Sequence, residues 1–362
     1  MPHLVVAISA HGFGHVAQTA PVINRLRQMA PDLQVTLRTA VPEFLLRARF
    51  AGAWQLDRSA SDFGMRMTSG LDVDVEASAG VYAAVHRDWR NQLRAEASML
   101  GALRPDLVFA NIPYLTLAAA ASLGVPTVAL CSLNWADIYQ HYCGHRPEAE
   151  EILGTMRSAY ASASLFLQPE PSMPMADLAN RERIGPIASL GRDQRAALRA
   201  RLQLAAQDRL VLVAPGGFAL SMNLERWPRL PGVHWLVPAQ QAVVRRDMTA
   251  LESLGLRFPD LLTAVDAVIG KPGYGTFAEV ACHGAAMLYV SRGDWPEQPC
   301  LVEWLQRSAR VLEISRTVFE RGDVGDALQA LWQLPERPPV VPTGIDDAAR
   351  LLAQRLPTIA SA

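Results

Sequence analysis

A glycine-rich turn with a histidine on each side lies near the start of the chain, between an apolar run and a helical segment. The apolar run Leu4–Ser9 is followed by Gly12, Gly14 and then His15. Glycines allow a sharp turn, and the first turn of a helix offers unpaired N–H groups to an anion. A neutral imidazole can take a proton from a hydroxyl group, so His15 is a candidate general base. In the alternative interpretation, His11 or His15 only packs or caps at this turn.

The glycine spacing also fits G-x-G-x-x-A, the fingerprint of dinucleotide-binding proteins. Those proteins place an acidic residue at the end of the second strand, about 20 residues further on. The second apolar run of this chain ends Leu37-Arg38-Thr39-Ala40, without an acid. The pattern therefore disfavours an NAD enzyme.

The segment 266–279 combines an apolar run, a glycine-rich turn and the start of a helix. Thr276 followed by Glu279 has the form of a capping box, which is the purely structural interpretation. In the functional interpretation, the turn binds a diphosphate through its backbone N–H groups and Thr276, with help from the helix dipole and Lys271. Glu279 would then accept hydrogen bonds from ribose hydroxyls.

Two more loops of the second half follow apolar runs, and ligands of open α/β sheets collect at such strand ends. Gly216-Gly217 follows the run Leu210–Ala214, and the segment 292–299 concentrates polar groups around Trp295. We interpret the segment 292–299 as a sugar-binding loop in which Trp295 stacks on a ring; the alternative is a plain surface loop. The candidate sugar ligands are Asp294, Glu297 and Gln298.

Asp137 and a small histidine cluster lie in the first half of the chain. Asp137 lies just after an apolar run, at a strand end where a second substrate with a hydroxyl group would enter. It is therefore either a second acid or base, or the cap of the next helix. His141, Cys143 and His145 follow at a spacing that matches no standard zinc site. We therefore predict no metal and no cofactor.

Alternating apolar runs and helical segments define the fold class. Runs in the first half, such as 34–38 and 107–110, are continuously apolar, which is typical of strands buried on both faces of a parallel sheet. A second series begins after the stretch Arg183–Gly191, which glycine and proline interrupt. We predict an α/β fold of two Rossmann-like parallel-sheet domains facing a cleft. The domains span 1–185 and 186–342, and 343–362 form a C-terminal helix and tail whose expected packing partner is the first domain.

The composition limits the class of protein. The chain has 362 residues, 50% of them hydrophobic, and a formal net charge of -1. Such a chain has no general attraction to nucleic acid or to an anionic membrane. The four cysteines form no CxxC pair, which fits a reducing compartment, and no segment reaches the roughly 18 apolar residues of a membrane span. We expect a cytoplasmic protein without a transmembrane segment, and peripheral membrane contact stays open.

Taken together, these motifs resemble GT-B glycosyltransferases, the group that includes the bacterial peptidoglycan N-acetylglucosaminyltransferase. The glycine turn ending in His15 is similar to the start of that family's N-terminal domain. The family's basic-x-Gly-x-x-Thr-x-x-Glu motif and a later glutamine match Lys271, Gly273, Thr276, Glu279 and Gln298.

A closer resemblance is to the glycosyltransferase-like N-terminal domain of plant arabinokinases. It spans nearly the whole chain and is carried by His11–His15, Asn134–Tyr139, Gly216-Gly217 and Gly270–Thr276.

These resemblances imply a GT-B architecture and sugar transfer, with His15 facing the acceptor as the base. The reaction would move a hexosyl or N-acetylhexosaminyl group from a nucleotide-sugar, with UDP favoured, to a hydroxyl acceptor with inversion. The alternatives are a nucleotide-sugar hydrolase or epimerase, and a non-catalytic nucleotide-sugar-binding protein of the same fold. The expected donor contacts are Gly14, Gly216, Gly217, Lys271, Gly273, Tyr274, Gly275, Thr276 and Glu279.

Overall fold

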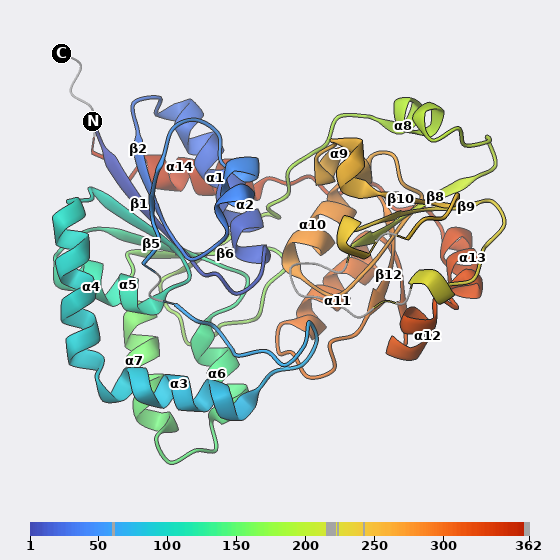
Figure 1. Ribbon diagram of the computed structural model, residues 1–362. Coiled ribbons are helices and arrows are strands. Elements are labelled where there is room, and N and C mark those ends of the chain that lie inside the picture. The colour runs from blue at the N-terminus through green and yellow to red at the C-terminus, as the bar shows by residue number, and fades with distance from the viewer. Residues whose placement is uncertain (60–61, 215–221, 223, 242, 358–362) are drawn as a thin grey trace. The chain divides into compact units, whose positions relative to one another are not determined.

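The computed structural model describes residues 1–59, 62–214, 222, 224–241 and 243–357 (Figure 1). The chain forms two compact units, which we describe separately. Unit 1 comprises Met1–Thr68, Val73–Ile187 and Thr343–Ala362. Unit 2 comprises Ala188–Pro342 together with the short segment Ser69–Asp72.

Unit 1 is built on a sheet of seven parallel strands in the order β3-β2-β1-β4-β5-β6-β7. The central strands are buried along their length, which explains why their sequences are continuously apolar rather than alternating. The strands are β1 (His3–Ile8), β2 (Gln34–Arg38), β3 (Gln55–Asp57), β4 (Leu107–Asn111), β5 (Thr127–Leu130), β6 (Leu165–Pro169) and β7 (Arg181–Ile184).

The helices of unit 1 pack in two groups. In the first group, α1 contacts both α2 and α14, and in the second α5 contacts α4 and α7. The C-terminal helix α14 is held to α1 by an ion pair of 2.5 Å between Arg25 Nε and Asp346 Oδ1. The helices are α1 (Gly14–Met29), α2 (Glu43–Arg49), α3 (Val75–Arg87), α4 (Trp89–Leu103), α5 (Tyr114–Ser122), α6 (Trp135–Cys143), α7 (Ala149–Ala161) and α14 (Gly344–Ala353).

Unit 2 is built on a second parallel sheet, of six strands in the order β10-β9-β8-β11-β12-β13. Its core includes Trp235 and Ile269 from the strands and Phe319 from a helix, and Leu71 of the segment Ser69–Asp72 belongs to the same cluster. The strands are β8 (Arg209–Ala214), β9 (Val233–Val237), β10 (Met248–Ala250), β11 (Ala267–Gly270), β12 (Ala286–Val290) and β13 (Arg310–Ile314). The helices are α8 (Arg195–Arg201), α9 (Phe258–Leu262), α10 (Tyr274–Cys282), α11 (Gln298–Ser308), α12 (Arg316–Arg321) and α13 (Gly325–Gln333).

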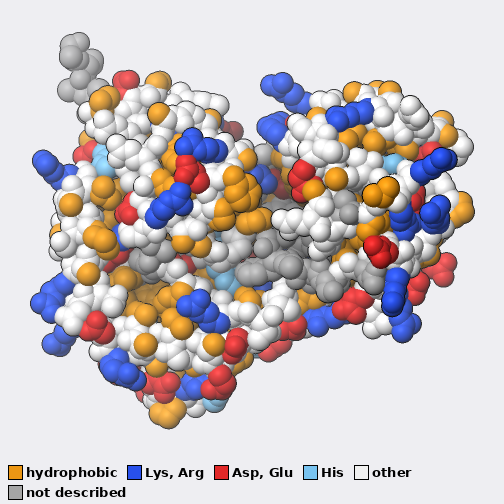
Figure 2. Space-filling model, in the orientation of Figure 1, with side chains coloured by type: hydrophobic (Ala, Val, Ile, Leu, Met, Phe, Trp, Pro, Cys, Tyr) orange, Lys and Arg blue, Asp and Glu red, His pale blue; other side chains and the backbone are white. Residues whose placement is uncertain are grey.

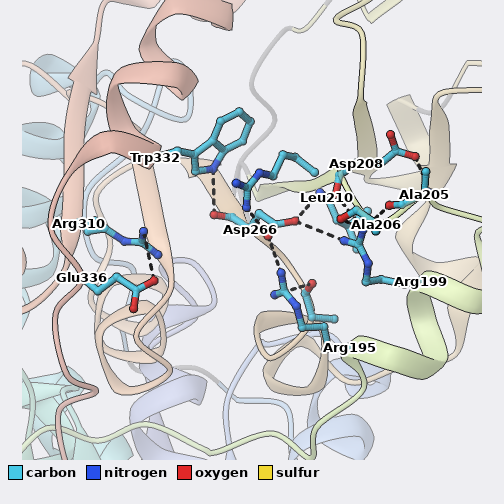
Figure 3. Close-up of polar contacts among 12 residues, drawn as sticks. Arg195, Arg199, Ala205, Ala206, Asp208, Leu210, Asp266, Arg310, Trp332 and Glu336 are labelled. Atoms are coloured by element: carbon cyan, nitrogen blue, oxygen red, sulfur yellow. Dashed lines mark hydrogen bonds and ion pairs between the residues drawn. The ribbon is translucent and has the colours of Figure 1, made fainter.

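A buried carboxylate, Asp266, ties the amino ends of β8 and β11 to helix α8 (Figure 3). Its Oδ1 accepts hydrogen bonds from Arg195 Nη2 at 2.6 Å and Arg209 Nη1 at 3.3 Å, and its Oδ2 accepts one from the backbone N–H of Leu210 at 2.8 Å. Arg199 of α8 lies 3.8 Å from the same carboxylate. This network fixes α8 at the edge of the sheet opposite to the carboxyl ends of the strands.

The predicted fold class is confirmed, because both sheets are parallel and helices connect their strands. On the face shown in Figure 2, Lys and Arg side chains lie among Asp and Glu side chains on both units. Of the helices in the described part of the chain, none combines the length and the apolar character that crossing a membrane requires.

Candidate functional site

Each sheet has one position where the strand order reverses, and ligands of open parallel sheets bind at the carboxyl ends of the strands there. In unit 1, β1 pairs with β2 on one side and with β4 on the other. In unit 2, β8 pairs in the same way with β9 and β11. The segments that follow β1 and β11 are the two motifs that the sequence singled out.

His15 is the second residue of α1 and follows directly from the turn after β1. The turn needs its glycine, because Gly12 has a φ of +80° in the left-handed region. Gly14 begins the helix, and a Cβ built on it would meet no atom within 4 Å. The His15 side chain is only 6% exposed, so the turn holds the imidazole at the carboxyl edge of the sheet and largely out of water.

Three buried side chains connect to His15 in a hydrogen-bonded relay. The imidazole Nδ1 lies 2.8 Å from the side-chain oxygen of Asn111, the last residue of β4. The Asn111 amide nitrogen donates to Gln18 Oε1 at 3.0 Å, and Gln18 Nε2 donates to the Ser132 hydroxyl at 2.8 Å. Since Asn111 oxygen is an acceptor, the matching tautomer of His15 carries its proton on Nδ1 and leaves a lone pair on Nε2.

Burial sets the charge of His15. It lowers the pKa of the imidazole to about 4, an effect that the hydrogen bond to Asn111 only partly opposes. At neutral pH the imidazole is therefore uncharged and able to accept a proton. This is the protonation state that the sequence-based assignment of His15 as a base requires.

His11 lies on the other side of the glycine turn and packs against aromatic and backbone groups. Its ring meets Trp135 edge-on, with the ring centroids 5.1 Å apart. A Cβ added to Gly64 would lie 2.8 Å from the His11 ring, so the backbone of Gly64 covers the imidazole. The backbone N–H of His11 donates to the Ser9 hydroxyl at 3.2 Å. Of the two histidines, only His15 is held by the relay.

Asp62 is a carboxyl group near the same strand end that the sequence analysis missed. Burial raises the pKa of this carboxyl to about 6, against opposing hydrogen bonds from Ser9, Gly64 and Phe63 and an opposing effect of Trp135. Its Oδ2 is buried, and among the described residues it has no hydrogen-bond partner. Asp62 follows no motif, and only the fold brings it next to the end of β1.

Asp137 lies in the first turn of α6, where it takes part in capping. The side-chain oxygen of Asn134, the N-cap residue, accepts from the backbone N–H of Asp137 at 2.8 Å, and its amide nitrogen donates to Asp137 Oδ2 at 2.8 Å. Burial raises the pKa of the Asp137 carboxyl. The N-cap residue of α6 is therefore Asn134, and Asp137 contacts that cap from the first turn of the helix.

In unit 2, the turn after β11 leads directly into α10. The helix begins at Tyr274 with Gly273 as its N-cap residue, and among the described residues no side chain makes a capping hydrogen bond to it. The helix does not have the capping box of the purely structural interpretation, because Thr276 is already inside the helix, two residues beyond Tyr274. The backbone N–H groups of the first turn, at Tyr274, Gly275 and Thr276, form a helix N-terminus of the kind that binds anions in proteins.

Lys271 and Glu279 flank this helix start. The Lys271 ammonium donates to the backbone oxygen of Gly70 at 3.2 Å, and burial, with a smaller effect of the Arg292 charge, lowers its pKa to about 7. Glu279 lies one and a half turns into α10 and is buried. Gly216 and Gly217, which the sequence also assigned to the diphosphate, lie outside the described residues.

The loop after β12 is stabilised by the side chains that were predicted to bind a sugar. Gln298 Oε1 accepts from the backbone N–H of Arg292 at 2.6 Å, and its Nε2 donates to the Ser291 hydroxyl at 2.5 Å. The Trp295 indole donates to Glu297 Oε2 at 3.2 Å and is buried, with the Arg292 guanidinium 4.0 Å above its ring. Asp294 is exposed at the tip of the loop. The polar groups of this loop thus bind one another, and Asp294 is the exposed one among the three candidates.

Among the described residues, no group of three or more His, Cys, Asp or Glu side chains is arranged to hold a metal ion. This region includes His141, Cys143 and His145, so these three residues make no metal site of that kind.

Comparison with the sequences of characterised proteins finds a distant relative of this chain. No family model matches the chain. L-arabinokinase of Arabidopsis thaliana is 23% identical over 312 residues, which cover 84% of this chain and 30% of the relative. The chain therefore spans less than a third of the length of the relative that it matches.

Comparison with solved structures identifies the fold. The glycotransferase of kitacinnamycin has a TM-score of 0.59 at 16% identity, with 98% of this chain and 100% of that chain covered. Arabidopsis thaliana UGT89C1, solved with UDP-L-rhamnose, has a TM-score of 0.60 at 14% identity, with 98% of each chain covered. Spinosyn rhamnosyltransferase SpnG, solved with thymidine diphosphate, has a TM-score of 0.57 at 16% identity, with 99% and 97% covered. The chain has the GT-B fold of glycosyltransferases, and the predicted resemblance to these enzymes and to arabinokinases is confirmed.

Proposed function

We propose that this protein transfers a sugar from a nucleoside diphosphate donor to a hydroxyl group of an acceptor, with inversion at the anomeric carbon. One observation supports the proposal: at each reversal of strand order, a strand is followed by a group suited to one part of this reaction. One group can accept the proton of the acceptor hydroxyl, and the other can bind the diphosphate. The end of β1 holds a neutral, buried imidazole, and the end of β11 leads through the N-cap residue Gly273 directly into helix α10.

The proposed reaction is a single displacement. The acceptor oxygen forms a bond to the anomeric carbon while the bond from that carbon to the diphosphate oxygen breaks. His15 takes the acceptor proton on Nε2, and the N–H groups of the first turn of α10 stabilise the charge that develops on the departing diphosphate. One displacement inverts the anomeric centre.

The donor contacts of the proposal follow the sequence motif. Tyr274, Gly275 and Thr276 contribute first-turn N–H groups, and Gly273 lets the phosphates approach the backbone closely. Lys271 and Gly14 supply further contacts to the diphosphate, and Glu279 binds the ribose hydroxyls. Asp294, Glu297 and Gln298 are proposed on the sugar side, where the exposed Asp294 is the first to test. No cofactor takes part.

UDP is the favoured donor nucleotide, with thymidine diphosphate next. Among proteins of the same fold, UGT89C1 was solved with UDP-L-rhamnose and SpnG with thymidine diphosphate. The transferred group is of the hexosyl or N-acetylhexosaminyl type, and the protein acts in the cytoplasm on a hydroxyl acceptor.

A transfer assay with mass-spectrometric detection tests the proposal. UDP-sugars and TDP-sugars are incubated with a panel of hydroxyl acceptors, and products are compared between wild type and His15→Ala. A glycosylated acceptor formed only by wild type supports the proposal. Free sugar and nucleotide released at full rate without acceptor, or isomerised donor, would instead identify a hydrolase or an epimerase. Nucleotide binding without turnover across the panel would identify a binding protein.

A further inference from the structure

The relay that begins at His15 is made only of uncharged groups. Asn111, Gln18 and Ser132 are buried, at 2% exposure or less, and come from β4, α1 and the segment after β5. The amide-to-amide and amide-to-hydroxyl distances in the relay lie between 2.8 and 3.0 Å, so each bond has good length. A buried relay in which every member is satisfied holds its side chains in one orientation.

The amide orientations assigned to Asn111 and Gln18 give the relay a direction, and with these orientations the proton of His15 is assigned to one ring nitrogen. Gln18 Oε1 accepts from Asn111 Nδ2, and this contact turns the oxygen of Asn111 toward the imidazole. An amide oxygen has no proton to donate, so Nδ1 must supply the proton of the 2.8 Å contact. The remaining ring nitrogen, Nε2, keeps its lone pair.

The surroundings of His15 contain other titratable groups, and none of them replaces this contact. The Cys131 thiol lies 3.8 Å from Nδ1, and His11 and Asp62 lie against Trp135, whose ring centroid is 5.8 Å from that of His15. Burial lowers the His15 pKa, and the hydrogen bond to Asn111 raises it only in part. A neutral amide can therefore orient an imidazole while raising its pKa less than a carboxylate would.

We infer that Asn111 is the positioning residue of His15: its amide oxygen selects the tautomer with Nδ1 protonated, so that Nε2 is a base with no charged partner. The inference rests on the proposed function for the use of that lone pair in sugar transfer, whereas the tautomer itself is a property of the free protein. Asn111 contacts His15 and not the substrate, so its effect acts through the imidazole.

The tautomer is measured without any substrate. Two-dimensional ¹⁵N NMR of histidine-labelled protein distinguishes a protonated from an unprotonated ring nitrogen, and the signal lost in His15→Gln assigns this residue among the eight histidines. We expect a single Nδ1-protonated tautomer from pH 6 to 8. An Nε2-protonated tautomer, or a mixture of both in wild type, would overturn the inference.

Two substitutions of Asn111 separate orientation from charge. Asn111→Ala removes the acceptor, and we expect both tautomers of His15 to appear. Asn111→Asp keeps the acceptor and adds a charge, and we expect the His15 pKa to rise by about 1–3 units. Asn91→Asp, an exposed asparagine on α4, is the matched control and should change neither quantity.

If the variants at position 111 fail to fold, Gln18→Met takes their place. It preserves side-chain length but removes the group that orients the Asn111 amide, so a mixture of tautomers is again expected. A single unchanged tautomer in Asn111→Ala or in Gln18→Met would contradict the positioning role.

Kinetics connect the tautomer to the proposed reaction. For a donor and acceptor that wild type turns over, kcat/KM is measured as a function of pH. In Asn111→Asp, the acid limb of this profile should shift to higher pH by about 1–3 units, as the imidazole pKa does. A substitution that only disturbs packing would lower the rate at all pH values and leave the limb in place, which would refute the link to catalysis. If the tautomer is as expected and no donor is turned over, the positioning stands and the proposed function fails.

Discussion

At the scale of single residues, the structure turns a motif histidine into a group with defined chemistry. The sequence placed His15 at the end of the first strand and suggested proton transfer, but it gave no reason for the imidazole to be neutral. Burial supplies that reason by lowering its pKa to about 4. The partner Asn111 lies 96 positions away in sequence, so only the fold could reveal it.

Replacing His15 by alanine tests the role of the imidazole. We expect turnover to fall by roughly 10²–10⁴-fold, because a general base contributes about that much to a proton transfer. Affinity for the nucleoside diphosphate should be unchanged, since the proposed donor contacts come mainly from α10. Steady-state kinetics and calorimetric titration with UDP measure the two quantities. His145→Ala, an exposed histidine of unit 1, is the control; an unchanged rate in His15→Ala would remove His15 from the mechanism.

The buried carboxyl of Asp62 makes a prediction about stability and pH. Its pKa is about 6 in the folded protein, against 3.8 ordinarily, so the fold favours the neutral form. Below pH 3.8 the carboxyl is protonated in both the folded and the unfolded chain and does not lower the free energy of unfolding. As pH rises from 3.8 to 6, the free energy of unfolding declines by up to about 3 kcal/mol, and above pH 6 it stays at the lowered value. In Asp62→Asn this decline should be absent.

Urea unfolding of wild type and Asp62→Asn between pH 4 and 8 measures the effect. The free energy of unfolding of the variant relative to wild type should increase from pH 4 to 6 and remain constant above. A difference that does not vary with pH would show that the Asp62 carboxyl is not shifted by burial.

At the scale of elements, the sequence predicted the buried strands well and the edge strands poorly. The runs 34–38 and 107–110 coincide with β2 and with the first four residues of β4, because a strand covered on both faces is largely apolar along its length. The edge strands β3, β7, β10 and β13 were missed, since they have few buried residues that could mark them. At the start of α10 the pair Thr276 and Glu279 has the form of a capping box, but the helix begins two residues before Thr276, at Tyr274.

A methyl group added at Gly273, the N-cap residue of α10, tests the proposed diphosphate site. A Cβ added to Gly273 would meet no atom of the described residues within 4 Å, and the φ of Gly273, -170°, suits any residue. Gly273→Ala should therefore fold, and its free energy of unfolding should fall by only about 0.5–1 kcal/mol, because alanine is a poorer N-cap residue than glycine. The methyl group would lie where the diphosphate approaches, and we expect affinity for UDP to fall by roughly tenfold or more, about 1.4 kcal/mol per tenfold.

Calorimetric titration and thermal unfolding of the same preparation measure both effects. Gly80→Ala, an exposed helix position with equally free space, is the control and should bind UDP as wild type does. Full affinity in Gly273→Ala would contradict the assignment of the diphosphate to this turn.

The network around Asp266 predicts a change in stability without a change in the site. Asp266→Ala removes the acceptor of the Leu210 N–H and the ion-pair partner of three arginines, and we expect a loss of roughly 2–3 kcal/mol (Figure 3). The melting temperature should fall by several degrees, while UDP affinity stays close to that of wild type because the network lies at the amino ends of the strands.

Differential scanning calorimetry with Asp323→Ala as an exposed control tests this prediction. A melting temperature equal to that of wild type would show that Asp266 does not hold α8 to the sheet.

At the scale of the whole molecule, parallel sheets decide where chemistry can take place. Each unit has one reversal of strand order, and the sequence motifs follow the strands at these reversals. The fold class could therefore be predicted from alternating apolar runs and helices. The contacts of Asp62 and Asn111 could not, because they join segments far apart in the sequence and follow no periodic pattern.

The most direct measurement of the central claim is a calorimetric titration of wild type with UDP, TDP, GDP, ADP, CDP and NAD. The account predicts that one nucleoside diphosphate, with UDP favoured, binds to one site per chain, and that Glu279→Ala weakens this binding because the ribose contact is lost. Binding of NAD alone, or of no nucleotide in the panel, would contradict a donor site at α10 and with it the proposed sugar transfer.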